Sequence, residues 1–130
     1  MKLGLDFHGV VDRYPRPFSE MTEAMIRAGH EVHIITGHRD NRALRESLSA
    51  LNIHYTHVFS ITSYHEQNGT PVKYDEKGNP WMDVEIWNAT KGWYCESHGI
   101  DFHIDDSPDY GKYFKTTAFF TYTKEPTNVS

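Results

Sequence analysis

Short apolar runs alternate with amphipathic stretches along most of the chain, and this alternation constrains the fold more than any other feature. The apolar runs predict strands at residues 3–5, 32–35, 57–62, 102–104 and 117–122. The stretches between them predict helices at residues 18–28, 41–51 and 84–98. Strands that alternate with helices pair in parallel, because each helix carries the chain back to the same edge of the sheet. We therefore expect an α/β fold, a Rossmann-like three-layer sandwich around a five-stranded parallel sheet.

The chain of 130 residues is expected to form one domain, because a chain of this length buries an ordinary core without disulfides or structural metals. We predict that this domain spans residues 1–124. Within it, residues 63–83 are polar and rich in turn formers, and they predict a small hairpin insertion around Val72-Lys73-Tyr74. Residues 125–130 lack apolar periodicity and are expected to form a loose tail.

Charge and composition exclude several classes of protein. The 13 basic and 18 acidic residues give a net charge of -5, so no global positive field is present to hold a long nucleic acid. No apolar run approaches the roughly 18 residues of a membrane span, and the first residues contain no secretory signal. Cys95 is the only cysteine, so no internal disulfide forms. We expect a cytoplasmic protein without a membrane partner, and a homo-oligomer is left open.

Residues with reactive or ligand-binding side chains follow three of the expected strands. They are Asp6 and His8 after the first strand, Thr36 and Gly37 after the second, and Asp105 and Asp106 after the fourth. Lys91 lies on the helix that precedes the last pair. Ligands of a doubly wound sheet bind beyond the carboxyl ends of its strands, so we expect all of these residues to share one crevice.

The residue types in this crevice favour phosphoryl chemistry. Two or three carboxylates suit Mg²⁺, which takes few protein oxygens, keeps several waters and binds phosphate oxygens. The Asp6 carboxylate is suited to attack phosphorus and form an acyl phosphate, which water hydrolyses in a second step. Thr36 and Lys91 are suited to hold the phosphoryl oxygens and to neutralise the charge that develops on them.

The ordered set of motifs resembles the haloacid dehalogenase-like phosphohydrolases over nearly the whole chain. The motifs that carry the resemblance are Asp6-Phe7-His8-Gly9-Val10, Ile35-Thr36-Gly37, Lys91 and Ile104-Asp105-Asp106. A receiver domain also uses acids, a threonine and a lysine, but it needs its acid pair on the first strand, whereas here the pair comes late.

The resemblance implies a Mg²⁺-dependent phosphomonoester hydrolase that acts through an aspartyl-phosphate intermediate. It makes Asp6 the nucleophile and assigns phosphate binding to Thr36, Gly37 and Lys91. The metal ligands that it implies are Asp6, His8, Asp105 and Asp106. His8 contributes its backbone carbonyl to the metal and its side chain to proton transfer.

His8 departs from the family pattern, which has a second aspartate at this position. Because the metal contact there is a backbone carbonyl, we expect Mg²⁺ binding to tolerate the change. Histidine both donates and accepts a proton near neutral pH, so it is able to protonate the leaving oxygen and later to activate water. The alternative that follows from this departure is a phosphate-binding or nucleotide-binding module that has lost turnover.

The substrate is expected to be a small phosphate ester, a nucleotide, or the end of a nucleic acid. Family members close their sites with cap domains, and here the predicted insertion is little more than a hairpin, which leaves the site open. Arg39, just after Thr36-Gly37, is placed to reach a substrate phosphate or base. Several aromatic residues either stack on a base or cover the core, and core packing is the favoured interpretation. These residues are Tyr64, Tyr74, Trp81, Trp87 and Trp93.

Overall fold

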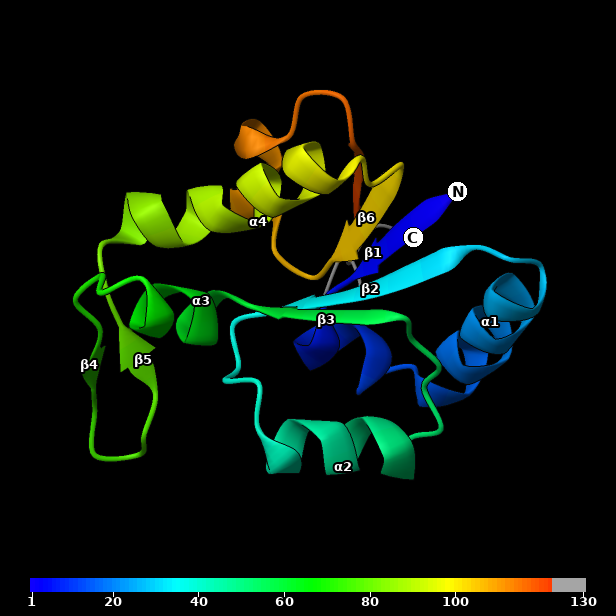
Figure 1. The fold of residues 1–130 in the computed structure, drawn as a ribbon, viewed down its shortest axis with the longest axis horizontal. Coiled ribbons are helices and arrows are strands. Elements are labelled where there is room, and N and C mark those ends of the chain that lie inside the picture. Colours follow the sequence, from blue (N-terminus) through cyan, green and yellow to red (C-terminus); the bar gives the residue numbers. More distant parts are fainter. Residues whose placement is uncertain (123–130) are drawn as a thin grey trace, which may run out of the picture.

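Five parallel strands form the central sheet of the computed structural model, which describes residues 1–122 (Figure 1). They are β1 (Lys2–Leu5), β2 (Glu31–Thr36), β3 (His57–Ser60), β6 (Phe102–Asp105) and β7 (Ala118–Thr121). The order across the sheet is β3-β2-β1-β6-β7, with β1 at the centre, and every neighbouring pair is parallel. This order reverses between β1 and β6, as in doubly wound sheets, and it directs ligands to the carboxyl ends of the central strands.

Helices cover both faces of the sheet, which confirms the predicted three-layer sandwich (Figure 1). The helices α1 (Pro15–Arg27) and α2 (Arg42–Ala50) lie on one face, and α4 (Val84–His98) lies on the other. The remaining elements are α3 (Ile61–Gln67), two short helical turns, η1 (Phe7–Val11) and η2 (Pro108–Tyr113), and a hairpin of β4 (Lys73–Tyr74) and β5 (Pro80–Trp81). No helix among residues 1–122 has both the length and the apolar character needed to cross a bilayer.

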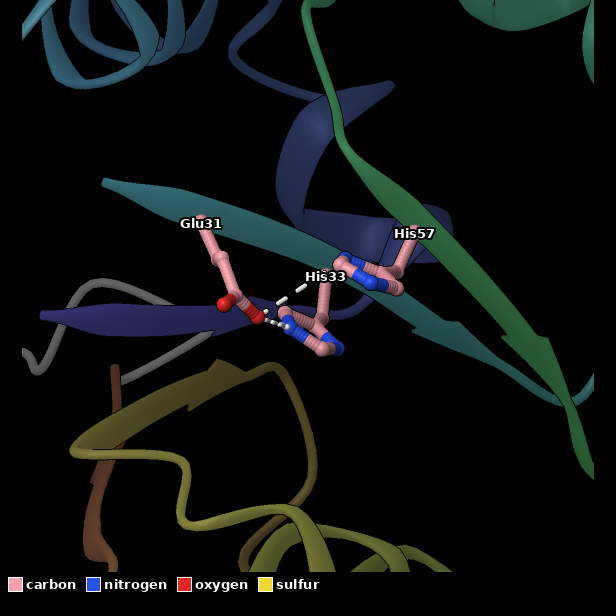
Figure 2. Close-up of side chains that lie close together, drawn as sticks. All are labelled: Glu31, His33 and His57. Atoms are coloured by element: carbon pink, nitrogen blue, oxygen red, sulfur yellow. Dashed lines mark hydrogen bonds and ion pairs between the residues drawn. The ribbon is translucent and has the colours of Figure 1, made fainter. Parts of the chain in front are cut away.

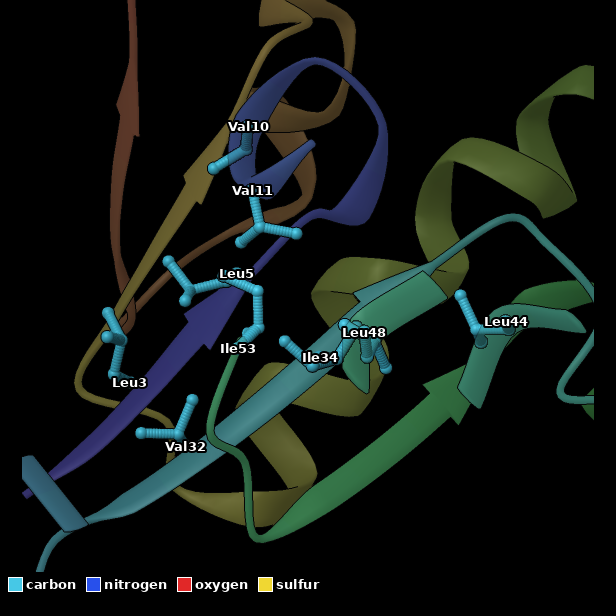
Figure 3. Close-up of a cluster of buried hydrophobic side chains, with 9 residues drawn as sticks. All are labelled: Leu3, Leu5, Val10, Val11, Val32, Ile34, Leu44, Leu48 and Ile53. Atoms are coloured by element: carbon cyan, nitrogen blue, oxygen red, sulfur yellow. The ribbon is translucent and has the colours of Figure 1, made fainter. Parts of the chain in front are cut away.

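Nine buried apolar side chains form the larger core, between the sheet and the α1–α2 layer (Figure 3). The central strands contribute alternate residues to it, because successive side chains of a strand point to opposite faces. The helix α2 contributes Leu44 and Leu48, which lie one turn apart on the same side of the helix. The nine residues are Leu3, Leu5, Val10, Val11, Val32, Ile34, Leu44, Leu48 and Ile53.

A second, smaller core lies on the opposite face of the sheet. It consists of Ile35 from β2, Tyr94 and Cys95 from α4, and Ile100, which follows that helix. Cys95 is completely buried, and burial raises the pKa of its thiol to about 12. The thiol is therefore protonated and shielded, so its part in the protein is to pack in the core rather than to react.

Helix ends follow the capping residues in the sequence. The side chain of Asn41 accepts a hydrogen bond from the Leu44 backbone N–H at 3.0 Å and begins α2. Asp83 caps α4 in the same way through the N–H of Ile86, also at 3.0 Å. Gly99 ends α4 in the left-handed conformation, with φ of 65°, which glycine adopts without strain. The predicted bounds of α4 are confirmed.

Two local predictions differ from the structure. The third strand was expected to reach residue 62, but it ends at Ser60, whose hydroxyl accepts the Ser63 N–H at 3.0 Å and begins α3. The first residues of α3, Ile61 and Thr62, are β-branched and therefore resemble a continuation of the strand. The Ser60 cap alone marks the change to a helix. The first helix begins at Pro15, three residues before the expected start, because prolines are tolerated in the first turn. The hairpin is confirmed, and the tail at 125–130 lies outside the described residues.

Glu96 generates a prediction about stability and pH. Its carboxylate accepts hydrogen bonds from the backbone N–H groups of Lys115, Thr116 and Thr117 and from the Thr116 hydroxyl, and it thereby fixes the turn before β7. These bonds, that of the Thr116 side chain first, lower the pKa of Glu96 to about 2. The folded protein therefore favours the charged form of Glu96. This contribution to the free energy of unfolding is fully present above the unfolded-state pKa and is lost as the pH falls toward 2.

We expect Glu96→Gln to destabilise the protein at neutral pH and to have a progressively smaller effect as the pH falls from about 4.5 toward about 2. Urea unfolding at several pH values measures the difference from the wild type. Glu76→Gln, in the exposed hairpin turn, is the matched control and should have no such pH dependence. A constant difference between Glu96→Gln and the wild type across this range would show that the charge of Glu96 contributes nothing.

Candidate active site

A cavity of about 430 Å³ opens at the carboxyl ends of the central strands. Because β1 pairs in parallel with both β2 and β6, the residues that follow these three strands meet at the same edge of the sheet. The predicted site residues that line the cavity are Asp6, His8, Thr36, Gly37, Arg39, Lys91 and Asp106. Asp105 is the remaining predicted site residue, and it is completely buried beside them.

Lys91 lies at the centre of the charged groups. Its ammonium is 2.7 Å from Asp105 Oδ2 and 3.1 Å from Asp6 Oδ1, and only 2% of the side chain is exposed. Burial opposes the charged form, but the two carboxylates outweigh it and raise the pKa of Lys91 above its usual range. The ring of Tyr110 covers the ammonium at 4.3 Å from the ring centroid. Lys91 is therefore a fixed positive charge at the base of the cavity.

Asp105 holds Lys91 in place. Oδ2 accepts from Lys91 and from Nε2 of the buried His103 at 2.9 Å, and Oδ1 accepts from the backbone N–H of Ser107 at 3.1 Å. Burial opposes ionisation here, but the His103 hydrogen bond and the Lys91 charge lower the pKa of Asp105 below its usual range. Both oxygens are thus already engaged, whereas Asp106 is the member of the pair that faces the cavity.

Asp6 combines a fixed position with an unfavourable environment for charge. It is 6% exposed, and Oδ1 accepts the Phe7 backbone N–H at 2.9 Å as well as the Lys91 ammonium. Burial raises the pKa of Asp6, Lys91 opposes this shift, and Asp105 and Asp106 add to it. Asp6, Asp105 and Asp106 each offer a carboxylate oxygen, and the three oxygens lie within 4.8 Å of one another. We call Asp6, Asp105 and Asp106 the acidic cluster, and its concentration of negative charge favours a divalent cation.

Gly9 allows the chain to turn away directly beneath this cluster. Its φ is 82°, in the left-handed region, and a Cβ atom added there would overlap the Asp106 carboxylate. The carbonyl of Gly9 accepts a hydrogen bond from the Tyr122 hydroxyl, beyond the end of β7. Glycine is therefore required at this position for two separate reasons, the backbone conformation and the space that Asp106 occupies.

His8 points into solvent at the mouth of the cavity, where Asp12 holds its ring. Nδ1 of His8 lies 2.9 Å from Asp12 Oδ2, and the other oxygen of Asp12 accepts the Gly9 N–H at 2.6 Å. The His8 side chain is 76% exposed. Asp12 was not predicted to belong to the site, and its spacing of four residues from His8 is no clear signal, because His8 and Gly9 have non-helical backbone angles.

The close approach of a tryptophan explains the glycine that follows Thr36. A Cβ atom on Gly37 would lie 2.6 Å from Cζ2 of Trp87, and the carbonyl of Gly37 accepts the Thr62 hydroxyl at 2.6 Å. The Thr36 hydroxyl accepts the His38 backbone N–H at 3.1 Å, which fixes the turn after β2. Trp87 was expected mainly to cover the core, but its ring also lines the cavity.

Arg39 connects the loop after β2 to the hairpin insertion. Its guanidinium forms two hydrogen bonds with Glu66, at 3.0 and 2.9 Å, and lies 5.0 Å from the centroid of the Tyr74 ring. Arg39 does line the cavity as predicted, but Glu66 neutralises much of its charge. Its clearest structural effect is to hold the hairpin, through Tyr74, against the mouth of the site.

Part of the cavity wall comes from residues that were not predicted to contribute. Asn79 and Pro80 of the hairpin and Tyr110 of η2 line it, and the Tyr110 hydroxyl accepts a hydrogen bond from Trp87 Nε1 at 3.2 Å. The element η2 was not predicted at all, because its residues show no apolar periodicity. The position of Tyr110 over Lys91 depends on how η2 packs on α4, so no local sequence signal identifies it.

Comparison with protein families, with curated proteins and with solved structures finds no match to this chain. The geometry of the site is therefore the basis for any statement about function.

Gly9 provides a test of how tightly the acidic cluster is packed. Gly9→Ala introduces both a left-handed alanine and an overlap with Asp106, whereas Gly29→Ala introduces the same backbone strain, at φ of 87°, with open space around the new methyl group. We expect Gly29→Ala to lower the free energy of unfolding by about 1–2 kcal/mol and Gly9→Ala to lower it further. Urea unfolding measures both values. Equal losses in the two variants would mean that Asp106 moves aside freely.

Proposed function

We propose that the protein is a Mg²⁺-dependent phosphomonoester hydrolase of the haloacid dehalogenase-like type, with Asp6 as the nucleophile. The observation that carries the proposal is the convergence of Asp6, Lys91, Thr36 and Asp106 on one cavity at the carboxyl edge of the sheet. A carboxylate nucleophile, a buried cation, a hydroxyl and a second acid are the groups that phosphoryl transfer through an aspartyl phosphate requires.

The donor atoms at the site fit Mg²⁺. They are all oxygens, and they come from carboxylates whose oxygens lie within 4.8 Å of one another, which concentrates negative charge in one place. Asp6 and Asp106 would hold the ion, together with the backbone carbonyl of His8 that the family resemblance implies. Asp105 supports them from behind through Lys91. When bound, the ion neutralises charge on the phosphoryl oxygens.

The residues of the chain have distinct parts in the proposed reaction. Oδ1 of Asp6 is occupied by Lys91 and by the Phe7 N–H, so we assign the attack on phosphorus to Oδ2. The new bond from Oδ2 to phosphorus forms as the bond from phosphorus to the ester oxygen breaks, and protonated His8 gives its proton to that leaving oxygen. Neutral His8 then takes a proton from a water molecule, whose oxygen attacks phosphorus and releases phosphate from Asp6.

Lys91 and Thr36 orient the transferred group. The Lys91 ammonium is held by two carboxylates before any substrate binds, so it stabilises developing negative charge without having to reorganise. Thr36, at the end of β2, offers its hydroxyl to a phosphoryl oxygen, and Gly37 lines the cavity beside it.

The cavity favours a substrate of modest size with a flat group attached to the phosphate. Its volume of about 430 Å³ is within the usual range for small ligands, and Tyr74, Trp87 and Tyr110 supply aromatic surface around the charged base. The net charge of -5 disfavours a long nucleic acid. A nucleotide, a similar small phosphate ester, or a nucleic-acid end is therefore the proposed substrate class.

Asp6→Asn separates the chemical role of Asp6 from its effect on stability. We expect the variant to lose turnover of an aryl phosphate in Mg²⁺, because an amide does not form the acyl phosphate. Without Mg²⁺ we expect its Tm to rise by a few degrees, as a gain of about 1 kcal/mol produces in a domain of this size, since ionised Asp6 is destabilised by burial. Phosphate release and thermal unfolding measure the two effects.

The matched control for this experiment is Glu76→Gln, which removes an exposed carboxylate outside the cavity lining and should change neither quantity. Turnover by Asp6→Asn at the wild-type rate would exclude the covalent mechanism. A wild-type protein that nucleotides stabilise thermally, but that releases no phosphate from nucleotides, sugar phosphates or phosphorylated DNA ends, would instead be the binding module that is the alternative function.

His8 is tested by substrates that differ in how much protonation the leaving group needs. We expect His8→Ala to reduce turnover of an alkyl phosphate by about 10²–10⁴-fold and that of nitrophenyl phosphate by clearly less, because nitrophenolate leaves without a proton. Asp12→Asn should have a smaller effect in the same direction, since Asp12 orients the ring but takes no part in the proton transfer itself. Equal losses on both substrates, or none, would remove His8 from the leaving-group step.

A further inference from the structure

A second group of ligand-type side chains lies at the opposite edge of the sheet, at the amino ends of β2 and β3 (Figure 2). Glu31 and His33 are two residues apart on β2, so their side chains point to the same face. His57 on β3 is the register partner of His33 and presents its side chain on that face as well. The strand pairing itself therefore brings one carboxylate and two imidazoles together.

The spacing of the donor atoms is short enough for one ion. Nε2 of His33 is 2.8 Å from Oε1 of Glu31, and Nδ1 of His57 is 3.9 Å from the same oxygen. All three donor atoms lie within 4.8 Å of one another. Ligands at about 2.0–2.1 Å from a tetrahedral metal are separated by similar distances, so the three donor atoms are close enough together to share one ion.

His33 is held in the orientation that a metal ligand needs. The side chain is only 2% exposed, and Nδ1 lies 2.7 Å from the hydroxyl of Tyr94 on α4. A ligating histidine typically donates its second ring N–H to such a partner, which fixes the tautomer and directs the other nitrogen toward the metal.

Glu31 and His57 leave room for the ion and a route to it. Their side chains are 39% and 49% exposed. The rings of His33 and His57 now stack almost parallel, with centroids 4.1 Å apart and an interplanar angle of 9°, so their lone pairs do not converge. Nδ1 of His57 also lies 2.8 Å from the Thr56 hydroxyl, so ligation requires the ring to leave both this hydrogen bond and the stack, and its exposure on the surface gives it room to do so.

We propose that Glu31, His33 and His57 form a Zn²⁺ site that joins β2 to β3 at the amino edge of the sheet. Two imidazole nitrogens and one carboxylate oxygen suit zinc, whereas Mg²⁺ prefers oxygen ligands alone. The fourth coordination position of the zinc ion would face solvent. The site lies at the end of the sheet away from the cavity, so its part is to fix strand β3 in register, and it does not depend on the proposed phosphatase activity.

The experiment measures Zn²⁺ binding to the full chain by competition with a chromogenic chelator, in an excess of Mg²⁺ that occupies the acidic cluster. We expect one Zn²⁺ per chain and a higher Tm when it is bound. Glu31→Gln and His57→Phe should each lower the affinity by about 100-fold or more, and Tyr94→Phe by about 10-fold, as expected for a supporting hydrogen bond. Co²⁺ in place of Zn²⁺ should give the intense visible absorption of a tetrahedral site.

The controls distinguish this site from the other candidates for zinc. Glu31→Gln and His57→Phe alter half-exposed side chains, and phenylalanine keeps the ring stack, so both variants should fold as the wild type does. His30→Gln removes a nearby histidine outside the cluster and should bind Zn²⁺ normally. Absence of Zn²⁺ binding, unchanged affinity in both Glu31→Gln and His57→Phe, or loss of the ion in Asp106→Asn would overturn the proposal.

Discussion

The buried ammonium of Lys91 is the interaction on which the rest of the site depends. It is bound by Asp6 after β1 and by Asp105 at the end of β6, so it links α4 to the two central strands. Removing Lys91 would leave two buried carboxylates without a compensating charge, and breaking a buried ion pair in this way typically costs several kcal/mol. The three residues are therefore constrained as a unit, and the position of the Asp6 carboxylate follows from that constraint.

Close packing around Lys91, Asp6 and Asp105 explains why several uncharged residues occupy their positions nearby. The backbone turns at Gly9 beneath Asp106, and the Trp87 ring approaches Gly37, at distances that exclude any side chain. Tyr110 closes the region above Lys91. Because burial raises the pKa of Asp6, the same packing that positions the carboxylate also makes its ionised form unfavourable. Such stored unfavourable energy is common where a protein is organised around a ligand or a reaction.

The two edges of the sheet present different chemistry for a common structural reason. Side chains that follow parallel strands gather at the carboxyl edge, where loops are free to carry Asp6, Thr36 and Asp106. At the amino edge the three residues lie within the paired strands themselves. Glu31 and His33 share a face because side chains alternate along β2, and the register of β2 with β3 places His57 beside His33. Oxygen donors dominate the first edge and imidazoles the second, which suits the two edges to different cations.

Local sequence patterns were enough to predict the architecture and the charged groups that line the cavity. Apolar periodicity is a local property that the final fold leaves unchanged, so the five strands, α4 and the grouping of Asp6, Thr36 and Lys91 could be predicted from it. Contacts in the folded protein set which of the two neighbouring acids faces the core: Asp105 faces inward and Asp106 lines the cavity, while Tyr110 covers Lys91. These outcomes depend on contacts between segments distant in the chain, such as His103 with Asp105 and η2 with α4, which no local pattern records.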